Sequence, residues 1–255
     1  MPAYTRYNYW SSSFRLPMTI TADILGDQIA YYRARAGEYD EWWFRTGRYD
    51  RGPEFNAHWH AETAAVESRL EQWLGARRPA SMLELACGTG LFTRRLAPHV
   101  AQLTAVDASP EVIAINRARV AADNVEYVEA DLFAWRPQRR YDAVFFSFWL
   151  SHVPEQRFAA FWEMIAAALK PGGAAYLIDS AFDPTSTAKD HVLPGHGASI
   201  VNRRLNDGRE FRIVKIFYEP EALAAKLATL GFRVDLRQTA RYFIHGEAIP
   251  PESVG

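Results

Sequence analysis

A glycine-rich turn constrains the fold of this chain more than any other feature of its sequence. The run Glu84-Leu85-Ala86-Cys87-Gly88-Thr89-Gly90 follows a short apolar segment, and a helical pattern starts directly after it. Glycines at such a turn let the backbone pass close beneath a ligand, where a Cβ atom would clash. The turn alone does not identify the ligand, because dinucleotide-binding folds use a similar loop for a pyrophosphate.

Strand and helix patterns alternate from residue 81 onward, as is typical of a parallel sheet covered by helices on both faces. The helix that begins at Ser109-Pro110-Glu111 has a serine cap, a proline in its first turn and an acidic neighbour. Strands are predicted over residues 82–86, 103–106, 125–128, 141–148, 174–178, 233–238 and 241–245, and helices over 91–96, 155–169 and 220–230. The fold class predicted is therefore α/β, with a seven-stranded, mostly parallel sheet.

Three regions are predicted along the chain. Residues 1–17 form a flexible leader, 18–78 an N-terminal helical cap with helices over 21–44 and 53–74, and 79–255 the main domain. A β-hairpin insertion over about 199–218 turns at Asn206-Asp207-Gly208 and forms a lid. Aromatic residues are concentrated in the first sixty positions, where they either cover an exposed flank of the core or close a ligand pocket.

Composition excludes several kinds of partner. The formal net charge is −1, which does not suit a surface that binds duplex nucleic acid. The apolar stretches, such as residues 143–150, are too short to cross a membrane. The single cysteine permits no intrachain disulfide and fits a reducing compartment. We expect a cytoplasmic monomer or homodimer that binds a small molecule, with no nucleic acid, membrane or metal partner.

Acidic residues at three successive strand ends narrow the choice of ligand. Glu84 precedes the glycine turn, Asp107 ends the second strand and Asp131 follows the third. Glu84 would repel a pyrophosphate but suits a ligand with an ammonium and a sulfonium, and Thr93 holds the position of the third dinucleotide-fingerprint glycine. Asp107 alone would be a helix-flanking acid, and Asp131 alone a solvated loop residue. Their joint placement at carboxyl ends of strands favours a binding site.

The run from Glu84 to Gly90 resembles the first motif of class I S-adenosylmethionine (SAM)-dependent methyltransferases of the small-molecule type. Asp107 matches the acid that binds the ribose in that family, and Asp131-Leu132 matches the adenine-binding position. The resemblance extends over residues 81–178 and implies a Rossmann-like fold, SAM as cofactor and S-adenosylhomocysteine (SAH) as product. The residues implied to contact the cofactor are Glu84, Ala86, Cys87, Gly88, Gly90, Asp107, Ala108, Asp131, Leu132 and Ser147, with Tyr32 and Arg35 from the N-terminal helix.

The N-terminal helix resembles the segment that folds over the bound cofactor in many family members. Tyr32, Arg35 and Tyr39 recur at helical spacing and are expected to share a face. We expect Arg35 to bind the methionine carboxylate of SAM. Tyr39, and Tyr49 in the following turn, are expected to contact the methyl acceptor.

The acceptor site is predicted from a histidine and a group of cations. His152 follows the fourth strand and is a candidate general base, although the same position also serves loop structure. A base is needed only if the acceptor arrives protonated. The hairpin carries Arg203, Arg204, Arg209, Arg212 and Lys215, either as a lid that grips an anionic acceptor or as a solvated hairpin with outward charges. We expect Arg204 and Lys215 to contact the acceptor.

The function predicted is methyl transfer from SAM to a small molecule, most simply to an oxygen of a carboxylate, a phosphonate, a phenol or another hydroxyl. The alternatives are an N-methyltransferase of a small amine and a non-catalytic SAM-binding protein. Glu84 and Thr93 argue against an NAD-dependent oxidoreductase. Residues 147–150 lack the motif of the DNA methyltransferases that modify amino groups.

Overall fold

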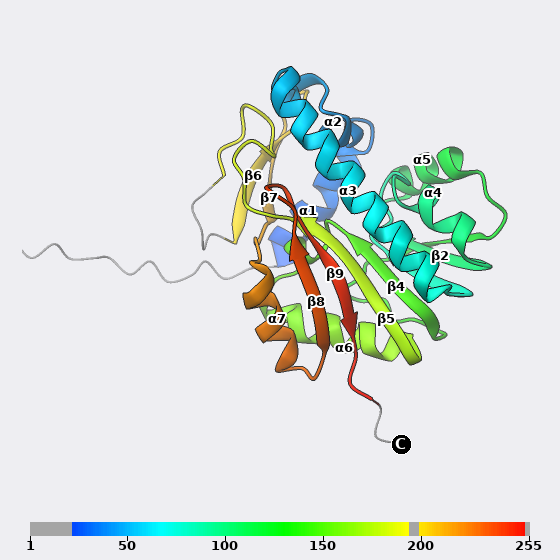
Figure 1. Cartoon of the computed structure of the whole chain (residues 1–255). Coiled ribbons are helices and arrows are strands. Elements are labelled where there is room, and N and C mark those ends of the chain that lie inside the picture. The colour runs from blue at the N-terminus through cyan, green and yellow to red at the C-terminus, as the bar shows by residue number, and fades with distance from the viewer. Residues whose placement is uncertain (1–21, 194–198, 253–255) are drawn as a thin grey trace, which may run out of the picture.

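A seven-stranded sheet forms the centre of the protein (Figure 1). The structure is a computed structural model that describes residues 22–193 and 199–252, so the predicted leader lies outside the described residues. The strands run in the order β3-β2-β1-β4-β5-β9-β8, and only β9 is antiparallel to its neighbours. Their bounds are β1 Ser81–Leu85, β2 Gln102–Asp107, β3 Val125–Glu129, β4 Tyr141–Ser147, β5 Leu169–Ser180, β8 Arg233–Gln238 and β9 Phe243–Ile249. The predicted fold class is confirmed.

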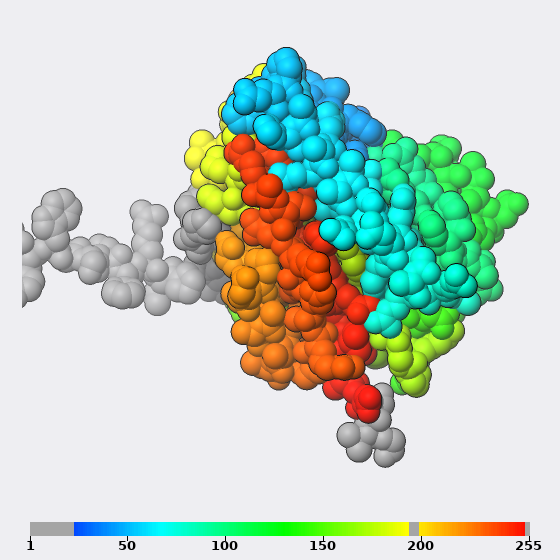
Figure 2. All heavy atoms as spheres, viewed as in Figure 1, coloured from blue at the N-terminus to red at the C-terminus, as the bar shows by residue number. Residues whose placement is uncertain are grey.

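Helices cover both faces of this sheet. Strand β4 shows the two layers, because Phe146 packs into the apolar cluster of α6 (Phe158–Ala168) and α7 (Pro220–Ala228), whereas Phe145 packs into that of α3 (Pro53–Arg77). The α3 helix lies along the closing strand, since Trp73 and Arg77 both donate hydrogen bonds to Glu247 of β9. Figure 2 shows the cyan atoms of α3 directly beside the orange and red atoms of β8 and β9. Within the described residues, no helix combines the length and apolar character that crossing a membrane requires.

The N-terminal helices and the hairpin meet beyond the carboxyl ends of the parallel strands (Figure 1). The helix predicted over 21–44 is two helices, α1 (Ala22–Arg35) and α2 (Asp40–Phe44), because the chain turns at residues 36–39, where Gly37 weakens the helix. The hairpin forms a separate two-stranded sheet of β6 (Ile200–Arg204) and β7 (Glu210–Val214). Tyr31 of α1 packs against Val201 and Ile213 of the hairpin. The cap and the hairpin are therefore joined by an apolar contact.

Some helix and strand boundaries are set by residues close together in the sequence, and others by contacts between residues far apart in the chain. The Ser109 hydroxyl accepts from the Val112 N–H at 3.2 Å and caps α5 (Pro110–Val120), as predicted. The helix predicted over 91–96 is only α4 (Thr93–Leu96), followed by a 3₁₀ turn that contains Pro98. The last strand begins at residue 243 rather than 241, because Glu62 of α3 accepts from the N–H groups of residues 241 and 242 and holds them in a turn.

The two glycines of the turn between β1 and α4 have different reasons to be glycine. Gly88 has φ +55 and lines a cavity, and a Cβ on it would meet only the Ala86 carbonyl oxygen, at an ordinary 3.9 Å. Gly90 has φ +88, and a Cβ on it would lie 2.7 Å from Oδ1 of Asn116. Asn116 is fully buried and donates hydrogen bonds to the Cys87 and Gly88 carbonyls. Gly90 therefore makes room for a helix side chain that braces the turn, and not for a ligand as the sequence had indicated.

Replacing Gly90 by Ala is expected to lower the free energy of unfolding by about 1–3 kcal/mol, because it adds both a clash with Asn116 and left-handed backbone strain. Gly26→Ala is the matched control, since Gly26 lies within α1, has an ordinary φ and has no atom near its Cβ position. That variant should be neutral or slightly stabilising. Urea denaturation measures both changes, and equal stability of the two variants would contradict the packing role.

Candidate active site

Two cavities lie at the carboxyl ends of the strands and share one wall. We call the first the glycine-turn cavity, because Ala86 and Gly88 line it, and the second the basic cavity, for the cations described below. Four side chains line both cavities: Tyr32, Tyr39, Phe148 and His152. The two cavities are therefore neighbours, with these four side chains as their common wall among the described residues.

Asp107 is fixed at the centre of the glycine-turn cavity. Its Oδ2 accepts from the Gly88 N–H and its Oδ1 from the Ser109 N–H, both at 3.0 Å. Burial raises the pKa of the Asp107 carboxyl, and these backbone donors oppose the rise. The carboxylate is held in one orientation on the cavity wall, where its remaining lone pairs suit a ligand with neighbouring hydroxyl groups.

The far end of the glycine-turn cavity is an apolar slot with one acid beside it. Leu132, Phe133 and Trp149 line it, and the rings of Phe133 and Trp149 lie 5.4 Å apart. Asp131 lines the cavity next to this slot and accepts from the Phe133 N–H at 2.9 Å. A flat heteroaromatic ring with an exocyclic amine fits this combination of apolar walls and a carboxylate.

The other predicted cofactor residues divide into two groups. Ala108 and Ser147 line the glycine-turn cavity beside Asp107, as Tyr32, Ala86, Gly88, Asp131 and Leu132 also do. Glu84, Cys87 and Gly90 lie behind the wall, and Glu84 is only 1% exposed. Burial raises the pKa of Glu84 to about 8, and among the described residues its Oε2 has no hydrogen-bond partner. Glu84 is therefore an acid one layer beneath the turn.

Phe148 connects the two cavities through a strained backbone. Its φ of 53° is in the left-handed region, which a bulky side chain adopts only when its surroundings enforce it. The Phe148 N–H donates to the Ile178 carbonyl at 2.8 Å, and its ring packs edge-on against Trp42, with 4.7 Å between the centroids. These contacts hold the ring between the cavities, so the strain is located at the shared wall.

Of the described residues, the wall of the basic cavity contains three buried cations and no carboxylate. Arg35, Arg203 and Lys215 are 9%, 8% and 7% exposed, respectively. Its lining among the described residues is Tyr31, Tyr32, Arg35, Tyr39, Trp42, Tyr49, Phe148, His152, Ser180, Ser186, Thr187, Leu193, Arg203, Ile213, Lys215 and Phe217. The aromatic residues of the cap therefore have two roles. Trp43 and Trp59 pack in the core, whereas this cavity is lined by Trp42, Tyr31, Tyr32, Tyr39 and Tyr49.

The two arginines of the basic cavity, Arg35 and Arg203, form no ion pair with any residue in 22–193 or 199–252. Arg35 donates to the Tyr49 hydroxyl at 3.1 Å and lies over the Tyr39 ring, 4.8 Å from its centroid. Arg203 has a buried Nη1 atom without a hydrogen-bond partner in the described part of the chain. Arg35 was predicted to bind the cofactor, but it lines the basic cavity and not the glycine-turn cavity, whereas Tyr39, whose ring it lies over, lines both.

Lys215 is held by two serine hydroxyls, and one of these residues, Ser180, lines the basic cavity. The Lys215 Nζ donates to the Ser151 hydroxyl at 2.8 Å and to the Ser180 hydroxyl at 3.2 Å, and Oδ1 of Asp179 lies 3.7 Å away. Burial lowers the pKa of Lys215 to about 8; Asp179 opposes this shift, and Arg203 adds to it. Lys215 is therefore a cation near neutral pH that loses its proton in mildly alkaline solution.

His152 uses both ring nitrogens within the protein. Nδ1 lies 2.6 Å from the Val214 carbonyl, which only accepts, so Nδ1 carries the proton. In the neutral ring Nε2 then accepts from the Tyr32 hydroxyl at 2.7 Å. Burial lowers the pKa of His152 well below its usual value, and the nearby Lys215 and Arg203 lower it further. The imidazole is neutral, and its one free lone pair is taken by Tyr32.

Arg204 was predicted to contact the acceptor, but it does not line the basic cavity, whereas its neighbour Arg203 does. Alternation along β6 turns Val201 and Arg203 inward and Arg204 outward, where its side chain is 53% exposed and faces Asp190. Tyr39, Tyr49 and Lys215 do line the basic cavity, as expected. The inward orientation of Arg203 is indicated in the sequence by the apolar residues two positions before and after it. These residues, Val201 and Leu205, share its face of the hairpin.

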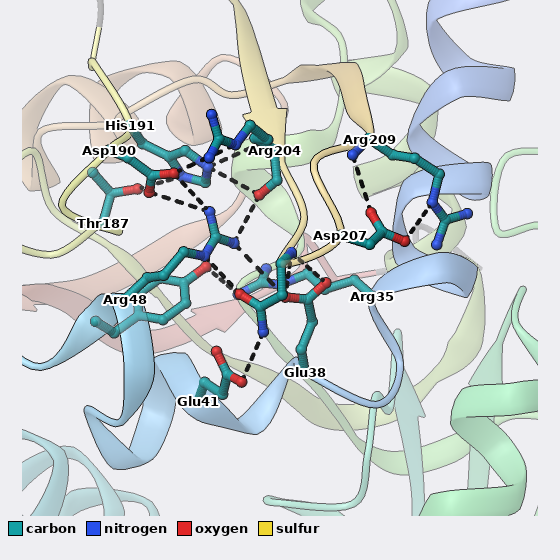
Figure 3. Close-up of polar contacts among 12 residues, drawn as sticks. Arg35, Glu38, Glu41, Arg48, Thr187, Asp190, His191, Arg204, Asp207 and Arg209 are labelled. Atoms are coloured by element: carbon teal, nitrogen blue, oxygen red, sulfur yellow. Dashed lines mark hydrogen bonds and ion pairs between the residues drawn. The ribbon is translucent and has the colours of Figure 1, made fainter.

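Arg48 fastens the cap to the segments that cover the basic cavity (Figure 3). Its guanidinium donates to the Arg204 carbonyl at 2.8 Å, to the Asn206 side chain at 2.7 Å and to both oxygens of Asp190 at 3.1 Å. The next residue, Tyr49, lines the cavity. One side chain of the cap therefore connects the hairpin and the preceding loop to the wall of the site.

Comparison with known proteins agrees with this geometry. A family model described as "Methyltransferase domain" matches residues 82–173. The ubiquinone biosynthesis O-methyltransferase of Xanthomonas euvesicatoria pv. vesicatoria (strain 85-10) is 35% identical over 67% of each chain, and that of Xylella fastidiosa (strain 9a5c) is 32% identical over 78%. The solved "DhpI-SAM-HEP complex" is 37% identical, with a TM-score of 0.73 over 91% of this chain and 100% of that one.

The chain belongs to the class I SAM-dependent methyltransferase family, and it is an enzyme of that class with SAM as its cofactor. The glycine-turn cavity fits SAM, because it presents Asp107 for a ribose, a flat apolar slot for an adenine, and no lysine or arginine that would repel the sulfonium. When bound, SAM supplies a methyl group on a positively charged sulfur. The protein's part is to orient that group toward the shared wall.

Asp107→Asn is expected to weaken SAH binding roughly tenfold or more, because an amide replaces one of the two acceptor oxygens offered to the ribose and removes the charge. Glu126→Gln, at an exposed position on the edge strand β3, is the control and should bind SAH normally. Isothermal titration with SAH measures both affinities. Unchanged affinity in the Asp107 variant would remove this residue from the cofactor site.

Proposed function

We propose that this enzyme transfers the methyl group of SAM to an oxygen of a small anionic acceptor, a carboxylate or a phosphonate, bound in the basic cavity. The observation that carries the proposal is the presence of Arg35, Arg203 and Lys215 in one buried wall that contains no carboxylate. Among the described residues, Lys215 is the one cation of the three with an acid within 4 Å, Asp179 at 3.7 Å, and burying charges without such a partner costs several kcal/mol. An anionic acceptor would offset this cost, and arginine offers a paired geometry for oxyanions.

The state of His152 supports an acceptor that is already ionised. Because Nε2 accepts from Tyr32 and the surrounding cations disfavour the imidazolium, His152 is poorly suited to take a proton from an acceptor. A carboxylate or phosphonate oxygen needs no base. Its lone pair forms the new O–CH₃ bond while the electron pair of the C–S bond stays on sulfur, so that an oxyanion and a sulfonium become an ester and neutral SAH.

The shared wall supports direct transfer between the two cavities. Displacement at the methyl carbon needs the nucleophile about 3 to 3.5 Å away, in line with the sulfur. Tyr32, Tyr39, Phe148 and His152 surround the only boundary that the two cavities have in common among the described residues. We place the methyl group at this boundary, with the acceptor oxygen held against it by the cations.

A phenolic or hydroxyl acceptor is the second candidate. It is favoured by the relatives named ubiquinone biosynthesis O-methyltransferase and by Lys215, whose pKa of about 8 would let its neutral form take a proton. N-methylation of a small amine is disfavoured, because an ammonium group would meet three cations in the cavity.

Turnover of matched acceptor pairs tests the proposal. Each pair consists of a small carboxylate or phosphonate and its neutral amide or ester of similar size, with a set of phenols alongside, and SAH formation is the readout. We expect turnover with the anions only. Reaction of phenols without any reaction of anions would favour the second candidate, and equal reaction of charged and neutral members would refute the role of the cations.

Arg203→Met and Arg204→Met form a matched pair, because the two residues are adjacent in β6 and face opposite sides. Loss of Arg203 is expected to raise KM for the anionic acceptor roughly tenfold or more, since a buried charge-assisted contact is lost. Loss of Arg204 should change KM little, because its side chain is exposed. Steady-state kinetics at saturating SAM measures both values, and a larger effect in the Arg204 variant would overturn the assignment.

The pH dependence follows from Lys215. Below a pH of about 8 the free enzyme carries a charged Lys215 that attracts the anion, so kcat/KM for a carboxylate acceptor should fall as pH rises through about 8. Lys215→Arg should move this alkaline limb to higher pH, because a guanidinium does not titrate there. The acceptor itself stays ionised throughout, since carboxyl groups titrate near pH 4. An unshifted limb in the Arg variant would assign it to another group.

A further inference from the structure

Asp40 lies where the cap meets the cofactor-binding turn. It is the first residue of α2, directly after Tyr39, which lines both cavities, and two residues before Trp42, which lines the basic cavity. Any contact that fixes Asp40 therefore also fixes the start of the helix that carries part of the acceptor wall.

Three elements meet at the Asp40 carboxylate. The Thr89 hydroxyl donates to its Oδ1 at 2.6 Å, and Arg119 in the last turn of α5 forms an ion pair with its Oδ2. Arg119 also donates to the Thr89 oxygen at 3.2 Å and closes a triangle of polar contacts. The carboxylate and guanidinium are 27% and 24% exposed, so solvent weakens the pair only in part.

Thr89 connects the contacts among Asp40, Thr89 and Arg119 to the cofactor site. Thr89 is 2% exposed and lies between Gly88, which lines the glycine-turn cavity, and Gly90. The Gly88 N–H in turn binds Asp107. A ligand that orders the glycine turn therefore orders the Thr89 hydroxyl, and through it the position of Asp40.

We propose that Asp40 is a positioning residue that transmits occupancy of the cofactor site to the acceptor wall. Cofactor binding fixes the glycine turn; the Thr89 hydroxyl and Arg119 then hold Asp40, which sets Tyr39 and Trp42 in place around the acceptor. The enzyme thus assembles its acceptor cavity after the cofactor is bound. The inference rests on the proposed function in assigning the basic cavity to the acceptor.

Hydrogen exchange of the full chain with and without SAH tests this coupling. Because the measurement needs no acceptor, its result does not depend on whether any acceptor of the turnover test reacts. In the native protein we expect SAH to slow exchange in two segments, residues 84–92 and residues 36–46. In Asp40→Ala, SAH should still protect 84–92, whereas its protection of 36–46 should fall roughly tenfold, the size expected for losing charge-assisted hydrogen bonds.

Two further variants separate coupling from damage to the fold. Thr89→Val removes only the hydroxyl at nearly constant volume, and it should also lose protection of residues 36–46 if Asp40→Ala does not fold. Arg33→Gln is the control, because Arg33 forms another ion pair between the cap and α5, with Glu111, that does not touch the glycine turn. Protection of 36–46 that is unchanged in both test variants, or lost equally in Arg33→Gln, would overturn the proposal.

Discussion

The active site of this methyltransferase depends on the hydrogen bonds that Asp107 accepts from the N–H groups of Gly88 and Ser109. They join the two turns that follow β1 and β2, so the glycine turn is connected directly to the capped start of α5. Asn116, four residues before the end of that helix, braces the same turn from behind. The cavity wall is thus held by backbone groups and a buried amide rather than by long flexible side chains.

The two cavities have opposite electrostatic character. Asp107 and Asp131 line the glycine-turn cavity, which contains no lysine or arginine, whereas the basic cavity contains three cations and no acid. A sulfonium is favoured on one side and an oxyanion on the other, and an aromatic and imidazole wall lies between them. Such a fixed arrangement stabilises the reacting charges without reorganisation of solvent.

Periodicity and local signals predicted most of the fold from the sequence. The order of strands and helices, the Ser109 cap and the hairpin turn all depend on residues close together in the chain. Long-range contacts decided the rest. The turn at residues 241 and 242 depends on Glu62, and the glycine at position 90 depends on Asn116, neither of which lies near in the sequence.

The residues of the site divide in the same way, into those that local sequence predicted and those that long-range packing decides. Asp107 and Asp131 were predictable because they end strands that a parallel sheet brings to one edge, and Lys215 because apolar residues surround it. The choice between Arg203 and Arg204 depends on a one-residue register that only the packing of Val201 and Leu205 sets. The oligomeric state and the cytoplasmic location stay predictions.

A crystal structure of the enzyme with SAH and a bound carboxylate or phosphonate would test this account most directly. The distance to measure is that from the SAH sulfur to the nearest acceptor oxygen, together with the side chains around each. We predict the sulfur beside Tyr32 and Phe148, and an acceptor oxygen that faces it while its other oxygens contact Arg203 and Lys215. An anion bound outside the basic cavity, or a sulfur turned away from the shared wall, would contradict the account.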